Sequence, residues 1–163
     1  MTKISSLAAM AGADVDTAAD LLTIADMSEA GAARNKKMTL AEFRAIPDFA
    51  LTAAGAIAAG NLVNIHSAAG AKIRKANATD ATKPANGFVL AAIADTISGG
   101  VFGPGRLITG LAGLTPGATY YLDTAAGGVT DTPPAASGNI IQEVGVAISA
   151  TVLLFAPKGT IEL

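Results

Sequence analysis

The chain has 163 residues, and only 15% of them are charged, against about 25% in an average soluble protein. Its net charge of −2 excludes the strongly basic surface of a nucleic-acid-binding protein, and the absence of cysteine excludes disulfides, thiolate catalysis and zinc–thiolate sites. Because the mean hydropathy is +0.47, a solitary subunit has few ionic groups to cover its surface, so we expect neighbouring subunits to cover part of it.

A membrane partner is not expected. The longest uncharged stretches, Phe49 to Ile65 and Leu107 to Leu122, are shorter than the roughly 20 apolar residues of a spanning helix. No polybasic segment points to an anionic membrane surface.

Residues 1–47 predict a small N-terminal module of one strand and one helix. An extended arm, "MTKISSL", is followed by "ADLLTIAD", which alternates weakly and predicts a strand from Asp20 to Ala25. In "KKMTLAEFRAIP", Thr39 and Glu42 form a capping box, which predicts a short helix from Leu40 to Ala45 that the next proline ends.

The rest of the chain predicts strands after a short connector. Residues 48–60 are rich in alanine and glycine, and we expect them to connect the two parts. Residues 61–163 hold many short apolar runs separated by glycine, proline and asparagine, which is typical of a small β-barrel or sandwich. The chain is therefore expected to be mainly β.

Two strand predictions specify faces of the sheet. In "NLVNIH", Leu62, Asn64 and His66 share one face, with the intervening residues on the other. In "NIIQEVGVAIS", Val144, Val146 and Ile148 are the residues expected on one face. Gly145 lies on the other face, where another segment can approach closely.

The following run, Val152 to Phe155, is apolar on both faces. Such a strand is expected to be covered on both sides, by the domain's own core or by a neighbour.

No motif in the sequence has the full set of residues that catalysis or ligand binding requires. His66 is the only histidine, "GVFGPGRL" lacks the lysine and hydroxyl of a phosphate loop, and "DVDTAAD" lacks the spacing of an EF-hand, which leaves at most a weak calcium site. The carboxylates are scattered, and nothing in the sequence brings two of them together. We expect no catalytic residue, no cofactor site and no metal site.

The densest basic segment is "KIRK". Lys72 and Arg74 share a strand face there, and two interpretations stay open: a solvated face, or an ion pair with an acidic patch on a neighbouring subunit. The segment "DTPPAASG" likewise predicts either a rigid loop or a protruding contact loop.

Three stretches resemble a known class of proteins. "GLTPGATYYLD", "GGVTDTPP" and "GNIIQEVGVAISATVLLF" resemble the C-terminal segment of many tailed-bacteriophage virion structural proteins. "AIAAGNLVNIHSAAGAKIRKANATDATKPANGFVLAAIAD" is similar to the barrel half that precedes it in those proteins. "MTKISSLAAMAGADVDTAADLLTIAD" is similar to a short N-terminal module that often carries attachment to the virion in head decoration proteins and fibres.

The resemblance implies a non-enzymatic capsid decoration, or cement, protein that binds between capsid subunits and stabilises the phage head. It implies a homotrimer whose partner is the major capsid protein, located on the capsid surface and in the host cytoplasm during assembly. The alternative is a tail or head fibre component that contributes to host-surface attachment. The residues expected at capsid or subunit interfaces are Lys3, Ile4, Leu7, Lys72, Arg74, Val152 and Leu154.

Overall fold

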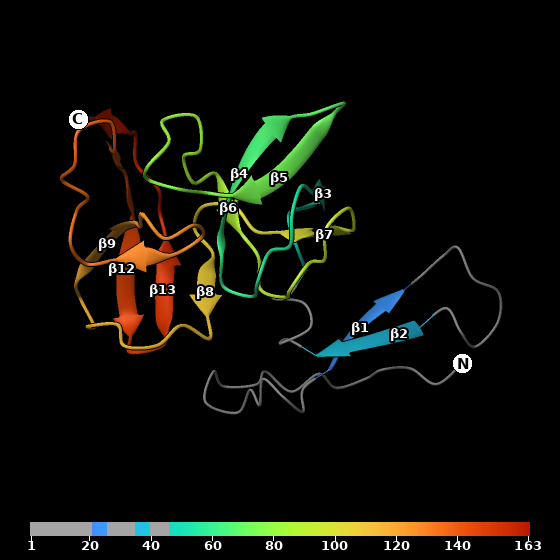
Figure 1. The fold of residues 1–163 in the computed structure, drawn as a ribbon. Coiled ribbons are helices and arrows are strands. Elements are labelled where there is room, and N and C mark those ends of the chain that lie inside the picture. The colour runs from blue at the N-terminus through green and yellow to red at the C-terminus, as the bar shows by residue number, and fades with distance from the viewer. Residues whose placement is uncertain (1–20, 26–34, 40–45) are drawn as a thin grey trace, which may run out of the picture. The chain divides into compact units, whose positions relative to one another are not determined.

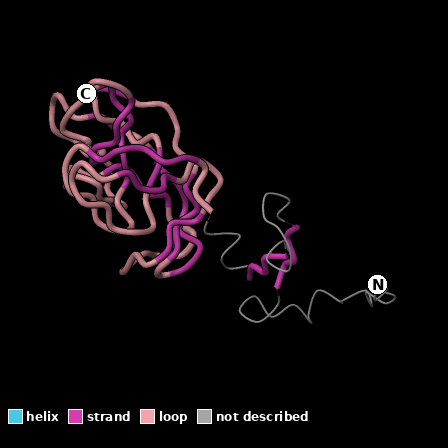
Figure 2. Tube along the Cα trace, turned by 90° about the vertical axis from the view of Figure 1, so that its right-hand side faces the viewer, coloured by secondary structure: helices cyan, strands magenta, loops and turns pink. Residues whose placement is uncertain are grey.

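The computed structural model describes residues 21–25, 35–39 and 46–163, and every regular element in these ranges is a β-strand (Figures 1 and 2). The expected mainly-β class is therefore confirmed. The chain divides into two units, Met1–Ile46 and Pro47–Leu163.

In the described residues of the first unit, β1 (Leu21–Ala25) and β2 (Asn35–Thr39) pair as antiparallel strands. The strand expected from Asp20 to Ala25 is confirmed from Leu21 onward. The helix expected from Leu40 to Ala45 lies outside the described residues.

One five-stranded sheet of the second unit has the order β6-β4-β5-β3-β7. Its strands are β3 (Phe49–Ala53), β4 (Leu62–Ser67), β5 (Ala71–Lys75), β6 (Gly87–Phe88) and β7 (Ser98–Val101). All pairs are antiparallel except β3 with β5. Phe88 and Phe102 exchange two backbone hydrogen bonds of 3.0 and 2.9 Å, so the end of β7 reaches β6 and the sheet curls back on itself.

The connector expected over residues 48–60 differs from the structure, because β3 lies within it. Phe49 and Leu51 alternate with smaller residues, and Ala53 is buried, so this stretch has the period of a strand despite its alanine content. The strand ends before Gly55, which has a φ of +101° and donates its N–H to Asp95 Oδ1 at 2.7 Å.

The other five-stranded sheet has the order β10-β9-β12-β13-β8. Its strands are β8 (Leu107–Thr109), β9 (Thr119–Leu122), β10 (Val129–Thr130), β12 (Glu143–Ser149) and β13 (Val152–Phe155). A two-stranded ribbon is formed by β11 (Ile140–Ile141) and β14 (Ile161–Glu162). We call the sheet that contains β4 the first sheet and the one that contains β12 the second sheet.

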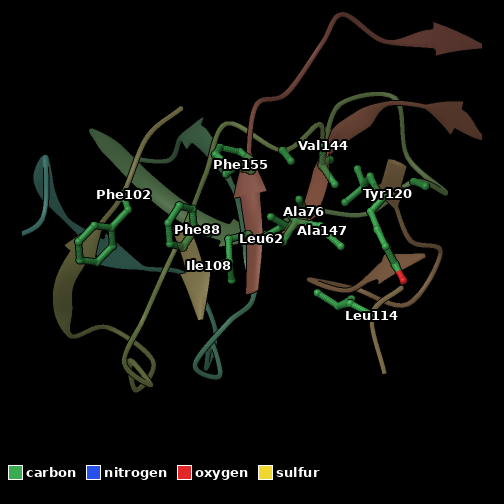
Figure 3. Close-up of a cluster of buried hydrophobic side chains, with 14 of the residues drawn as sticks. Leu62, Ala76, Phe88, Phe102, Ile108, Leu114, Tyr120, Val144, Ala147 and Phe155 are labelled. Atoms are coloured by element: carbon green, nitrogen blue, oxygen red, sulfur yellow. The ribbon is translucent and has the colours of Figure 1, made fainter. Parts of the chain in front are cut away.

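Two hydrophobic clusters fill the second unit. The larger one takes its side chains from both sheets, and the ring of Phe88 contacts those of both Phe102 and Phe155, with ring centroids 5.4 Å apart in each pair (Figure 3). The smaller one belongs to the first sheet. Strand β4 supplies both, because Leu62 enters the larger cluster and Val63 the smaller, which confirms the alternation expected for this strand.

Candidate interaction surface

Strand β13 divides its side chains between the core and the outside of the second sheet. Leu153 and Phe155 are fully buried in the larger cluster, so Val152 and Leu154 lie on the opposite, outer side. The pairing register places Leu154 beside Val146 of β12 and Leu107 of β8. A row of apolar side chains therefore crosses three neighbouring strands.

Strand β12 continues this row, but its residues are divided between the two faces differently from the sequence prediction. Val144 and Ala147 are buried, whereas Val146 and Ile148 are 38% and 55% exposed. The expectation that Val144 shares a face with Val146 and Ile148 is wrong. The register with β9 shifts between Glu143 and Gly145, and the extra residue of this bulge reverses the alternation.

Gly145 is the residue that makes the reversal possible. It has a φ of +155°, and a Cβ at this position would collide with the carbonyl oxygen of Leu154. The close approach expected at this glycine is therefore confirmed, and the approaching segment is β13 of the same sheet.

We define the outer apolar face as the exposed side of β8, β12 and β13, formed by Leu107, Val146, Ile148, Val152 and Leu154. Leu107 is 44% exposed, and Val152 and Leu154 are half-buried. None of the residues of β8 and β13 is charged. An exposed apolar area without charges is suited to packing against another protein, because each Å² removed from water contributes about 25 cal/mol.

The other expected interface residues occupy different places. Arg74 is engaged within the chain itself: its Nε donates to Asn64 Oδ1 at 2.9 Å and its Nη2 donates to the Thr82 carbonyl oxygen at 2.7 Å. Lys72 lies at the Cα register position opposite His66. Lys3, Ile4 and Leu7 lie outside the described residues.

His66 is half-buried on β4, as expected for a strand residue. Its Nε2 is buried without a hydrogen-bond partner. Within residues 21–25, 35–39 and 46–163, no group of three or more histidine and carboxylate side chains is arranged to hold a metal ion.

The "GVFGPGRL" segment joins the two sheets and is fastened by Asp48. The Asp48 carboxylate accepts the Gly103 N–H at 2.7 Å and forms an ion pair with Arg106 at 2.8 Å. The hydrogen bond from Arg106, followed by that from Gly103, lowers the pKa of Asp48 below its usual range. Sequence reasoning missed this role because the partners lie 55 and 58 positions away.

A hollow beside β9 and β10 is a second feature that the sequence did not predict. It has a volume of about 430 Å³, and its lining combines apolar and polar residues, two of them aspartates: Leu111, Ala112, Gly113, Leu114, Tyr120, Asp123, Val129, Thr130 and Asp131. We call it the acidic hollow. Asp123 follows β9 and Asp131 follows β10, and both line this hollow.

Tyr120 supports one wall of the acidic hollow. The side chain is 4% exposed, and its hydroxyl oxygen accepts the Thr115 N–H at 2.9 Å. In Figure 3 this hydroxyl points toward the Leu114 side of the cluster. Tyr120 thus holds the 113–115 turn in place and presents little of its ring to solvent.

Across the described ranges, nothing helical has the length and apolar character that crossing a membrane requires. No protein-family model matches this sequence, and comparison with curated proteins returns no match. The assignment of a function therefore depends on the surfaces described above and on the sequence resemblance.

Proposed function

We propose that this chain is a non-enzymatic structural subunit of a phage virion that decorates the head by packing its outer apolar face against the major capsid protein. The observation that carries this proposal is the uncharged row of Leu107, Leu154 and Val146 across three strands of one sheet. The resemblance of three sequence stretches to virion structural proteins supports the choice of partner.

Stabilisation of the shell follows from binding alone. A subunit that binds only assembled capsid protein favours the assembled state by RT ln(1 + [L]/Kd), and this gain is repeated at each site of the shell. No bond is made or broken, so the chain needs shape, apolar area and sufficient concentration.

The outer apolar face supplies part of the necessary contact. A stable interface buries about 800 Å² on each partner, more than five partly exposed side chains provide. The N-terminal arm with Lys3, Ile4 and Leu7 is the further contact that the sequence suggests, through pairing with a free sheet edge.

The test uses heads of the parent phage assembled without this chain. Purified wild-type protein should co-sediment with these heads. Leu154→Asn should weaken co-sedimentation at least about tenfold, because it places a polar amide in the middle of an apolar contact. Ile97→Asn makes the same kind of change at a 56% exposed residue between β6 and β7, away from the outer apolar face, and this matched control should bind as the wild type does.

Failure of the wild type to co-sediment would refute the proposed partner. Equal binding by Leu154→Asn would instead move the contact away from the outer apolar face. Thermal unfolding of each variant verifies that reduced binding does not reflect loss of the fold.

The alternative of a fibre component that attaches to host sugars would draw on an exposed aromatic platform. The two tyrosines of the chain do not form such a platform, because Tyr120 is buried and Tyr121 is half-buried. A glycan-array screen distinguishes the two functions, and specific sugar binding would favour the fibre.

A further inference from the structure

The charges of the second unit are unevenly paired. Most of its lysine and arginine side chains are engaged with groups of the same subunit: Arg74, Lys83, Arg106 and Lys158. In residues 46–163, Lys72 and Lys75 alone among these cations make no hydrogen bond or ion pair, and both belong to β5.

The acidic side chains of the second unit are also unevenly paired with cations. Asp48, Asp80 and Glu143 are ion-paired, whereas Asp123 and Asp131 line the acidic hollow with no cation beside them in the described part of the chain. Asp131 is exposed, and its Oδ1 accepts one hydrogen bond, from the Thr132 hydroxyl at 3.2 Å.

The acidic hollow is suited to a lysine side chain. Its walls include Leu111, Leu114 and Val129, which can cover the aliphatic stem, while Asp123 and Asp131 supply negative charge for the ammonium. Its volume of about 430 Å³ leaves room for a side chain and water.

The two features lie apart on one subunit. Figure 1 shows the β4–β5 hairpin projecting from one side of the second unit and β9 on the other side. Lys72 is near the tip of this hairpin, because the turn ends where β5 begins at Ala71. A subunit therefore cannot place Lys72 in its own hollow.

We propose that the β4–β5 hairpin of one copy inserts Lys72 into the acidic hollow of a second copy, where Asp123 and Asp131 receive its ammonium group. The contact joins two different surfaces, so it is head-to-tail, and repetition closes a ring when the rotation between copies allows it. This inference concerns a surface other than the outer apolar face and does not depend on binding to a capsid.

Charge reversal on each side tests the pairing. Lys72→Glu places like charges together, as does Asp131→Lys, so each single variant should weaken self-association at least about tenfold in sedimentation velocity. The double variant Lys72→Glu/Asp131→Lys restores opposite charges in every contact, whatever the number of copies, and should recover most of the wild-type association.

Lys75→Glu is the matched control, since it changes the same charge on the same strand but away from the hairpin tip. It should associate as the wild type does. Circular dichroism and thermal unfolding of all variants verify the fold, which these partly or fully exposed positions should not disturb.

Three results would overturn the inference. A wild type that stays monomeric at high concentration has no such contact. Single variants that associate normally, or a double variant that fails to recover, would show that Lys72 and Asp131 do not meet. If Leu154→Asn dissociates the protein while Lys72→Glu does not, copies associate through the outer apolar face instead.

Discussion

Asn64 of the first sheet and the pair Val146 and Ile148 of the second sheet are unusual for opposite reasons, because a polar side chain is buried in one place and apolar side chains are exposed in the other. In the first sheet, the polar side chain of Asn64 is buried under the subunit's own 84–86 segment, where it donates to the Pro84 carbonyl oxygen at 2.9 Å and to Asn86 Oδ1 at 3.0 Å. In the second sheet, Val146 and Ile148 remain exposed with no chain above them in the described part of the subunit.

The comparison shows which groups of this chain find their interaction partners within the chain and which do not. A buried amide needs hydrogen-bond partners in the same subunit, and Asn64 has them. Exposed apolar side chains gain no such partner within the chain once the core is filled, so another protein that covers those of the second sheet removes apolar area from water.

The largest expected effect is a difference in stability between substitutions on the two sides of β13. Leu153→Ala should lower the free energy of unfolding by about 3 kcal/mol, because it leaves a cavity in the larger cluster. Leu154→Ala, one position later on the outer side, should lower it by no more than about 1 kcal/mol. Urea denaturation at pH 7 measures both, and equal losses would contradict the assignment of the two faces.

A substitution at the bulge of β12 should lower the stability of the fold nearly as much. Gly145→Ala forces a Cβ toward the Leu154 carbonyl oxygen, so we expect a loss of about 2–3 kcal/mol in urea denaturation. Gly138→Ala is a control for adding a methyl group at a glycine with positive φ, since nothing lies near its Cβ position. A Gly145 variant as stable as the control would disprove the close approach.

The next largest loss of stability is expected at Asn64, the buried polar residue of the first sheet. Asn64→Ala leaves the Arg74 guanidinium and the Pro84 carbonyl each without one partner, so we expect a loss of about 2 kcal/mol. His66→Ala, two positions along β4, removes a side chain whose Nε2 has no partner and should cost less. We expect a lower urea midpoint for Asn64→Ala than for His66→Ala, and the reverse order would contradict this prediction.

The smallest effect is the pH dependence of the segment that joins the sheets. Because the folded-state pKa of Asp48 is lowered, its contribution is complete above the unfolded value of about 3.9 and is lost as the pH falls through the folded value. Asp48 is partly exposed, so Asp48→Asn should cost no more than about 1 kcal/mol at pH 7.

Urea denaturation of the wild type and of Asp48→Asn at pH 7 and pH 3 separates this contribution from that of the other carboxylates. The difference between the two proteins should shrink at pH 3. A difference that stays constant would show that the ion pair with Arg106 contributes nothing to the pH dependence.

Local alternation was enough to predict several parts of this molecule. The mainly-β class, the strand ending at Ala25 and the faces of Leu62 and Val63 follow from a period of two residues, which needs no knowledge of the partners. For Val152 to Phe155 the same period does not decide which side is internal, because all four residues are apolar; the structure places Leu153 and Phe155 in the core.

The parts that sequence reasoning missed depend on contacts between distant segments. The reversal at Val146 requires the register with β9, and the inward position of Arg74 requires the loop that carries Thr82. The acidic hollow exists because the β9–β10 hairpin carries Asp123 and Asp131 to the turn near Leu114. The strand at Phe49 was missed because small residues obscure its alternation.

The mutual backbone bonds of Phe88 and Phe102 have a consequence for behaviour at high concentration. An exposed edge strand can pair with a strand of another molecule and start a fibril. The backbone bonds between Phe88 and Phe102 join β6 to the end of β7, so these two edge strands of the first sheet are partly paired with each other. At the borders of the second sheet, β8 and β10 have three and two residues, which is too short to nucleate cross-β growth. The two five-stranded sheets therefore offer only short free borders to a strand of another molecule.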